Sequence, residues 1–406
     1  MPWNVALFAL KVHIIFMWIA RECEPLVRRM AQQFPAVLVT GARQVGKTSL
    51  LRRLFPGASY LTLDFPGHAE AARTAPDQLL DQYRPPLILD EIQYVPDLLR
   101  HVKVRIDRDR SPGQYLLTGS QVFALMQGVS ESLAGRCGVL TLHTLSLGEL
   151  AARENGADEA DYLFRGGYPA LYGDTEAELW FPSYVATYLE RDIRNVLRIG
   201  DLQEFHRFMR VCALRNAQVL NYSDLARDAG VSPNTARKWL GLLEASGILA
   251  LAEPYFGNRT KRLIKAPKLV FLDSGLAAFL AGFRSAGGLF GSPYAGAFWE
   301  AYVFGQVFRQ GANLGRPVSV HYWRTAGGQE VDLVVELGAG EIWAAECKWK
   351  EHPGPGDEGG LRALAAAEKG SLTERFVVCR TEVTYRLPDG TWVVNLPAFL
   401  ERLRNA

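Results

Sequence analysis

The 406-residue sequence is poor in cysteine and nearly neutral, and each shortage excludes a class of protein. Its five cysteines are scattered, and none has metal-ligand spacing: Cys23, Cys137, Cys212, Cys347 and Cys379. An odd number of cysteines without regular spacing argues against a disulfide framework and against a zinc site. It predicts reduced thiols in the cytoplasm. A formal net charge of +2 creates no global field for nucleic acid, so any such binding requires a local basic patch.

The sequence also lacks an uninterrupted apolar run long enough to span a membrane. Its most apolar segment, Val5–Ala20, is short for a span and contains Lys11 and His13. No small-residue cleavage site follows, which argues against a signal peptide. Residues 1–16 are then either a buried helix or a segment translated upstream of a natural start at Met17. We favour the upstream start, and we expect no membrane partner.

From about residue 17 to residue 160, apolar strand segments alternate with helical segments. Such alternation is typical of an α/β domain, in which helices cover both faces of a parallel sheet. The apolar fraction of 48% is ordinary for a globular protein, and the length suggests two or three domains. We expect strands at Ala36–Thr40, Tyr60–Leu63, Leu87–Leu89, Tyr115–Thr118 and Gly138–Leu142.

A Walker A loop follows the first strand and leads into a helix that begins at Lys47. Its glycines let backbone N–H groups curve around a phosphate, and the helix adds its positive N-terminal end. The lysine of this pattern reaches the terminal phosphates, and the Thr48 hydroxyl binds Mg²⁺. The sequence therefore predicts ATP and Mg²⁺ as cofactors. We expect the nucleotide to contact Gly41, Ala42, Arg43, Gln44, Val45, Gly46, Lys47, Thr48 and Ser49.

Two acids follow the third strand, at the end where the phosphate loop is also expected. Asp90 is expected to hold Mg²⁺, usually through water, and Glu91 to polarise the attacking water as the catalytic base. Two carboxylates after a strand are also typical of a solvated turn. The Walker A loop favours the catalytic interpretation, because the carboxyl ends of parallel strands meet at one edge of a sheet.

Two further residues are candidates for catalysis. Ser120 ends the segment Leu117–Ser120, where a polar side chain could orient the water near the γ-phosphate; a helix cap is the alternative. Arg136 could act as an arginine finger or a lid contact, and a surface salt bridge is the competing interpretation.

Residues 201–285 contain the pattern of a winged helix. A capped helix from Tyr222 and a glycine turn precede a second helix that begins near Pro233. Asn234, Arg237 and Lys238 would then face outward, where a helix-turn-helix presents side chains to DNA. The alternative is a packing module between the two flanking domains. The expected wing is also basic, with Arg259, Lys261, Arg262 and Lys265.

The last part of the chain carries a sparser set of charged residues. Glu346 and Lys348 are two apart on an expected strand and therefore share a face. With Asp332 on a neighbouring strand and Glu300 on a helix, three carboxylates could bind Mg²⁺ while the lysine activates water. This arrangement resembles that of PD-(D/E)XK nucleases. The alternative is a degenerate nuclease-like fold that only binds a partner.

Several motifs together resemble those of AAA-type ATPases that carry a C-terminal DUF4143 domain. The resemblance covers nearly everything from Met17 onward, and it implies ATPase chemistry more than a biological role. The sequence has Ser120 where many AAA proteins have asparagine. Besides the Walker A loop, the motifs are Phe34–Val37, Leu89–Glu91, Leu117–Ser120, Phe164–Pro169, Tyr188–Asp192 and Asp273–Leu276.

These observations predict a P-loop NTPase domain at 17–160, a helical lid or connector at 161–200, a winged-helix region at 201–285 and a restriction-endonuclease-like α/β domain at 286–406. We expect a Mg²⁺-dependent ATPase whose nucleotide state controls a C-terminal module acting on nucleic acid, with DNA as a candidate partner. The alternative is an ATP-dependent switch or scaffold whose degenerate nuclease-like domain binds a protein partner. Either protein could be an oligomer.

Overall fold

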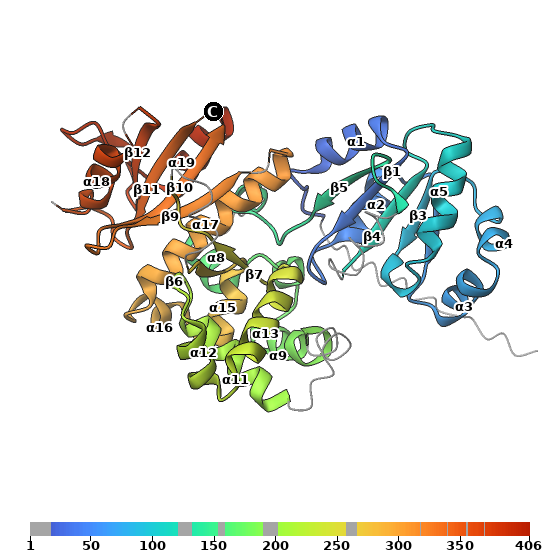
Figure 1. Cartoon of the computed structure of the whole chain (residues 1–406), viewed down its shortest axis with the longest axis horizontal. Coiled ribbons are helices and arrows are strands. Elements are labelled where there is room, and N and C mark those ends of the chain that lie inside the picture. The colour runs from blue at the N-terminus through green and yellow to red at the C-terminus, as the bar shows by residue number, and fades with distance from the viewer. Residues whose placement is uncertain are drawn as a thin grey trace, which may run out of the picture.

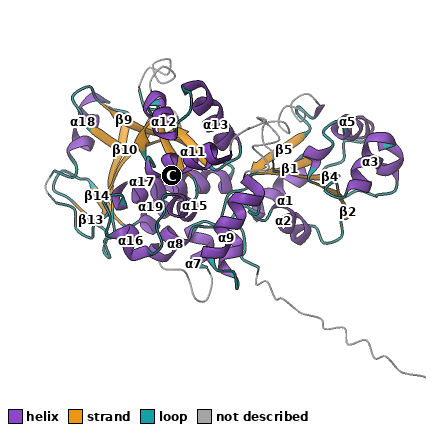
Figure 2. Ribbon diagram, turned by 90° about the horizontal axis from the view of Figure 1, so that it is seen from below, coloured by secondary structure: helices purple, strands orange, loops and turns teal. Residues whose placement is uncertain are grey.

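The computed structural model describes residues 18–120, 132–152, 159–189, 202–256, 266–316, 318–338, 340–354, 356–368 and 370–406. A parallel sheet lies at one end of the molecule and a mixed sheet at the other (Figure 1). Helices of the middle part of the chain lie between the two sheets (Figure 2). The N-terminal segment 1–16 lies outside the described residues.

The N-terminal part is an α/β unit built on a five-stranded parallel sheet. The strand order is β2-β3-β4-β1-β5, and all four neighbouring pairs run parallel. The expected α/β fold is thereby confirmed, and β1 is buried along its whole length, as a strand covered on both faces must be. Its elements are α1 (Glu24–Gln33), β1 (Ala36–Thr40), α2 (Lys47–Leu54), β2 (Ser59–Thr62), α3 (Pro66–Thr74), α4 (Pro76–Asp81), β3 (Leu87–Asp90), η1 (Ile92–Tyr94), α5 (Leu98–Arg108), β4 (Tyr115–Gly119), β5 (Cys137–Thr141) and α7 (Leu147–Ala151).

The middle part is mainly helical. Its elements are α8 (Glu159–Arg165), η2 (Pro169–Tyr172), α9 (Ala177–Tyr184), η3 (Val185–Leu189), α11 (Leu202–Leu214), β6 (Gln218–Val219), α12 (Tyr222–Ala229), α13 (Pro233–Ala245), β7 (Leu249–Ala252), β8 (Lys268–Phe271), α15 (Ser274–Leu280) and α16 (Ala286–Phe290). The strands form an antiparallel sheet in the order β6-β8-β7.

Local sequence sets the turn between α12 and α13. The Asn221 side chain caps α12, Gly230 ends it with a left-handed φ of +76°, and Ser232 caps α13. Two helices joined in this way, beside a small antiparallel sheet, agree with the expected helix-turn-helix. The winged-helix assignment itself stays a prediction, because the expected wing lies outside the described residues.

The C-terminal part combines one long helix with a mixed sheet. The sheet order is β13-β14-β12-β11-β10-β9, in which β10 is antiparallel to β11 and β11 is parallel to β12. Neither the 20-residue α17 nor any other described helix is long and apolar enough to cross a membrane. The elements are α17 (Ala295–Leu314), β9 (Ser319–Arg324), β10 (Glu330–Gly338), β11 (Glu341–Cys347), α18 (Gly359–Ala367), β12 (Leu372–Val378), β13 (Tyr385–Arg386), β14 (Trp392–Val394) and α19 (Leu396–Asn405).

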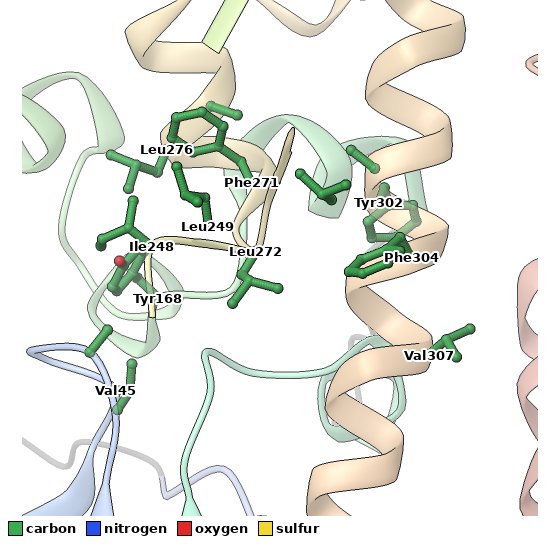
Figure 3. Close-up of a cluster of buried hydrophobic side chains, with 14 of the residues drawn as sticks. Val45, Tyr168, Ile248, Leu249, Phe271, Leu272, Leu276, Tyr302, Phe304 and Val307 are labelled. Atoms are coloured by element: carbon green, nitrogen blue, oxygen red, sulfur yellow. The ribbon is translucent and has the colours of Figure 1, made fainter. Parts of the chain in front are cut away.

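One continuous apolar core joins all three parts. It runs from the face of the parallel sheet that carries Val37 and Val39, through the middle part, to the mixed sheet. Val45, in the phosphate loop, points toward Tyr168 and Ile248 of the middle part (Figure 3). On the other side of this region, Tyr302 and Val307 of α17 belong to the same core. The phosphate loop is therefore packed, through Val45, against the middle part of the chain.

Candidate functional site

The Walker A loop follows a tight path at the carboxyl end of β1, and two glycines fix it. Gly41 has a φ of +135°, and a Cβ built there would stand 2.1 Å from the carbonyl oxygen of Leu142. Gly46 has a φ of +96° and is the N-cap of α2. A side chain would be strained at either position, and at Gly41 it would also collide with backbone. The loop thus leads directly to the positive N-terminal end of α2.

Lys47 lies inside this loop, as the sequence predicts. Its side chain is buried, and Nζ donates to the carbonyl oxygens of Gly41 at 3.1 Å and Ala42 at 2.8 Å. A buried ammonium requires such acceptors, because removing it from water is costly. The lysine thereby lies at a pocket of about 230 Å³. Residues of the Walker A loop and residues that follow β3 and β4 line this pocket: Arg43, Gln44, Gly46, Lys47, Thr48, Ser49, Glu91 and Ser120.

Asp90 sits at the centre of a hydrogen-bond network. Its Oδ1 accepts from the hydroxyls of Thr48 and Thr118, both at 2.6 Å, and its Oδ2 accepts from the Tyr60 hydroxyl at 2.8 Å. Burial, and then the hydrogen bond to Asp90, raise the pKa of Tyr60 to about 12. The sequence predicted that Asp90 and Thr48 each help to hold Mg²⁺, and the structure places the two side chains in contact. The sequence analysis missed Tyr60 and Thr118, which come from the strands on either side of β3.

Glu91 is turned toward the same pocket by an unusual backbone conformation. Its φ of 57° and ψ of 47° are left-handed, and its N–H donates to the Thr118 hydroxyl at 3.0 Å. The carboxylate accepts from Ser120 Oγ at 3.2 Å and from the Gln93 amide. The structure therefore brings Ser120 against the expected base, at the edge of the sheet where the phosphate loop lies.

Tyr60→Phe should raise the Mg²⁺ concentration that half-saturates ATP binding by about fivefold. The change removes one hydrogen bond of about 1 kcal/mol that orients Asp90, and it leaves the other two in place. Calorimetric titration of ATP at a series of Mg²⁺ concentrations measures this shift. Tyr385→Phe, in the distant C-terminal sheet, is the matched control. An unchanged Mg²⁺ requirement in Tyr60→Phe would show that the tyrosine does not position Asp90.

Arg136 does not lie at this site. It directly precedes β5, whose first residue pairs with the first residue of β1, whereas the phosphate loop follows the last residue of β1. A five-residue strand separates these positions by about 16 Å. Its Nε instead lies 2.7 Å from Asp107 Oδ1 on α5. Within this chain Arg136 therefore does not reach the pocket as a finger or lid contact, and the salt-bridge alternative agrees with the structure.

Arg21, a buried arginine that the sequence analysis did not single out, forms a hydrogen bond with the phosphate loop. Arg21 donates from Nε to Glu149 at 2.9 Å and from its two terminal nitrogens to the carbonyl oxygens of Val45 and His143. Glu149 also completes the cap of α7, accepting from the Ser146 N–H. One guanidinium thus connects the phosphate loop to the segment after β5.

The C-terminal carboxylates also come together, as expected. Lys348 Nζ lies 2.7 Å from Glu346 Oε2 and 3.8 Å from Asp332 Oδ2. Asp332 also accepts from the Cys347 N–H at 2.8 Å. Gly360 lies so close that a Cβ would stand 2.5 Å from Glu346 Oε1, so α18 begins directly against the cluster.

Two residues of this cluster were missed from the sequence. Lys268 of β8 enters from the middle part, and its Nζ lies 2.6 Å from Glu300 Oε1. It also pairs with Glu330, and it lies 3.9 Å from Asp332 Oδ1. Alternation along β10 could have indicated Glu330, which is two residues from Asp332 and shares its face. Nothing in the sequence near Lys268 connects it to this site.

Burial dominates the electrostatics of the cluster. It raises the pKa of Glu300 to about 8, and the charge of Asp332 adds to this shift. Burial and Asp332 likewise raise the pKa of Glu346. Burial opposes the charge on Lys268, but Glu300 and Asp332 outweigh it and raise its pKa. Burial also opposes the charge on Lys348, but Asp332 and Glu346 outweigh it and raise its pKa, so both lysines stay charged beside the acids.

The residues expected to face DNA are at the surface. Asn234, Arg237 and Lys238 are exposed near the start of α13, and Arg237 lies over the ring of Tyr222 at 4.4 Å. The four basic residues of the expected wing lie outside the described residues: Arg259, Lys261, Arg262 and Lys265.

Three family descriptions match successive parts of the chain. Residues 33–151 match an AAA domain, residues 157–287 a domain of unknown function called DUF8612, and residues 295–399 the domain of unknown function DUF4143. The first match covers the phosphate loop, Asp90 and Glu91. The third covers the carboxylates of the C-terminal cluster.

Two curated proteins match most of the chain. Rv2008c of Mycobacterium tuberculosis and Mb2031c of Mycobacterium bovis, both described as uncharacterized, are each 33% identical over 387 residues, which is 93% of this chain and 83% of theirs. Among solved structures, a Walker-type ATPase of Pyrococcus abyssi aligns with a TM-score of 0.41 and 16% identity, over 64% of this chain and 94% of its own. The RuvB Holliday junction branch migration motor of Thermotoga maritima aligns with a TM-score of 0.30 and 20% identity, over 60% and 92%.

Proposed function

The chain belongs to the family of the two mycobacterial proteins that it matches, and we propose that it binds Mg²⁺–ATP and hydrolyses it. The observation that carries the proposal is the contact of 2.6 Å between the Thr48 hydroxyl and Asp90. Thr48 lines the same pocket as Lys47 and Glu91. A hydroxyl and a carboxylate at this spacing are hard oxygen ligands of the kind that Mg²⁺ prefers.

Each residue of the pocket has a part in this reaction. Lys47 binds the terminal phosphates from inside the loop, and the N-terminal end of α2 offsets their charge. Thr48 and Asp90 would hold Mg²⁺, which neutralises charge on the β- and γ-phosphates. Glu91 accepts the proton of the attacking water, and Ser120 orients the Glu91 carboxylate.

Lys47→Ala should weaken ATP binding by about 10- to 150-fold. A hydrogen bond to a charged group contributes about 1.5–3 kcal/mol, and the alanine leaves the phosphates without it. Equilibrium titration of the purified protein with ATP and Mg²⁺ measures the loss. Lys103→Ala, which removes a half-exposed lysine on α5, is the matched control. If Lys47→Ala bound ATP as tightly as the unmodified chain, this loop would not be the nucleotide site.

The C-terminal cluster suggests a second function. We propose that nucleotide binding controls a C-terminal module that acts on nucleic acid, with Asp332, Glu346 and Lys348 as its reactive groups. The observation that favours it is the placement of Lys348 at 2.7 Å from Glu346 and 3.8 Å from Asp332. Three carboxylates and a lysine are suited to metal-assisted cleavage of a phosphodiester. The exposed Asn234, Arg237 and Lys238 would supply phosphate contacts.

Lys348→Ala should abolish strand cleavage without abolishing Mn²⁺ binding, because the lysine activates water and is no metal ligand. Incubation of the full chain with linear DNA, Mn²⁺ and ATP tests this, with Lys350→Ala on the same loop as control. Cleavage by Lys348→Ala at the normal rate would remove the lysine from the reaction.

A switch or scaffold that binds a protein partner is the competing function. In that case the unmodified protein, Lys348→Ala and Lys350→Ala would all fail to cleave DNA. DNA would also not stimulate the release of phosphate from ATP. For a DNA-acting protein, stimulation should fall steeply with salt, because phosphate contacts release counterions.

A further inference from the structure

Lys268 is the most deeply buried charge of the C-terminal cluster, yet it belongs to the middle part of the chain. We call Glu300, Glu330 and Asp332 the acidic triad; each offers a carboxylate oxygen within 4.8 Å of the other two. The Lys268 side chain is 3% exposed, and its Nζ contacts all three. The ring of Tyr322, on β9, lies 5.3 Å from Nζ and adds a cation–π contact.

Two contacts join α17 to the segment Lys268–Leu272, which consists of β8 and the residue after it. At one end Lys268 pairs with Glu300, and at the other the buried Arg309 donates to the carbonyl oxygen of Leu272. Four residues of strand and nine residues of helix both span about 13 Å, so the two contacts are in register. Arg309 also donates to Thr144 at 2.9 Å, in the segment after β5.

A second set of bonds fastens the middle part to the mixed sheet on the other side of Lys268. The Tyr322 hydroxyl donates to the carbonyl oxygen of Ala266 at 2.6 Å, just before β8. The Tyr255 N–H donates to the carbonyl oxygen of Tyr322, where Pro254 forms a bridge to β9. The backbone on either side of Lys268 is therefore fastened to its neighbours, which keeps the lysine next to the acidic triad.

We propose that Lys268 is a tethered cation that competes with divalent metal ions for the acidic triad. The inference builds on the second function above, since Asp332 belongs both to the acidic triad and to the proposed reactive groups. Two cations cannot share three oxygens within 4.8 Å of one another without strong repulsion. A metal ion that binds the triad must displace the ammonium, and the middle part of the chain thereby controls access to the triad.

Mn²⁺ titration without nucleotide, followed by calorimetry or by the spin resonance of free Mn²⁺, tests the proposal on the full chain. We expect Lys268→Met to bind Mn²⁺ at least about tenfold more tightly than the unmodified protein, because a like charge next to the ion is gone. Lys268→Arg keeps the cation and should bind no better than the unmodified protein. The double variant Lys268→Met/Asp332→Asn should lose this gain in Mn²⁺ affinity. Because the double variant retains Asp90, the loss would identify the acidic triad, rather than the nucleotide site, as the place where Mn²⁺ binds.

Removing Lys268 leaves buried carboxylates unpaired, so Lys268→Met should melt at a lower temperature than the unmodified chain unless Mn²⁺ is present. If it fails to fold, Lys268→Met/Glu330→Gln removes one charge of each sign, and it should bind Mn²⁺ more tightly than Glu330→Gln alone. Equal Mn²⁺ affinity with and without the lysine would overturn the proposal. So would a folded Lys268→Met protein that binds no Mn²⁺. Because no nucleotide is present, neither result bears on ATP hydrolysis.

Discussion

Glu91→Gln should lower the rate of ATP hydrolysis by about 10²- to 10⁴-fold, the usual contribution of a positioned general base. Glutamine has nearly the same shape as glutamate, so the contacts with Ser120 and the left-handed backbone at this position can persist. Its amide, however, cannot accept a proton from water. ATP binding should remain, because Lys47, Thr48 and Asp90 are unchanged.

Single-turnover phosphate release from preformed complexes separates the chemical step from binding in this variant. Glu70→Gln, on the exposed face of α3, is the matched control and should hydrolyse ATP at the normal rate. Normal hydrolysis by Glu91→Gln would place the base elsewhere in the pocket.

Arg21→Met should lower the free energy of unfolding by about 3–5 kcal/mol, the typical cost of breaking a buried ion pair. Both side chains are almost fully buried, at 3% exposure for Arg21 and 0% for Glu149. The change leaves the Glu149 charge without its partner and removes the donors to the carbonyl oxygens of Val45 and His143. ATP affinity should also fall, because Val45 belongs to the phosphate loop.

Urea unfolding of the full chain measures this loss of stability. Arg28→Met, which changes an exposed arginine on the nearby helix α1, is the control and should change the midpoint little. Arg21→Met/Glu149→Gln removes the stranded charge and should recover part of the loss. A midpoint for Arg21→Met equal to that of Arg28→Met would mean that the buried pair does not hold the loop.

The nucleotide site was largely predictable from the sequence because phosphate binding imposes a local pattern. Gly41, Gly46 and Lys47 are needed within a few residues of one another, and Asp90 must end a neighbouring strand. Tyr60 could not be predicted, because its role depends on the order of strands in the sheet. Arg21 was missed for a related reason: its partners are a loop carbonyl and a glutamate 128 residues away.

Arg136 precedes β5, and in a parallel sheet that order alone puts it at the end opposite the phosphate loop, where it pairs with Asp107. In the C-terminal part, strand alternation correctly placed Glu346 and Lys348 on one face and brought Asp332 beside them. Lys268 was beyond reach, since the packing of one domain against another, rather than any local pattern, inserts it among the carboxylates.

Mg²⁺-dependent release of phosphate from ATP by the full chain tests the central claim most directly. We expect the unmodified protein to release phosphate over many turnovers, to stop when Mg²⁺ is chelated, and to lose this activity in both Lys47→Ala and Glu91→Gln. ATP that binds in the presence of Mg²⁺ but is never hydrolysed, or hydrolysis that persists in both variants, would contradict the assignment of this pocket as an ATPase site.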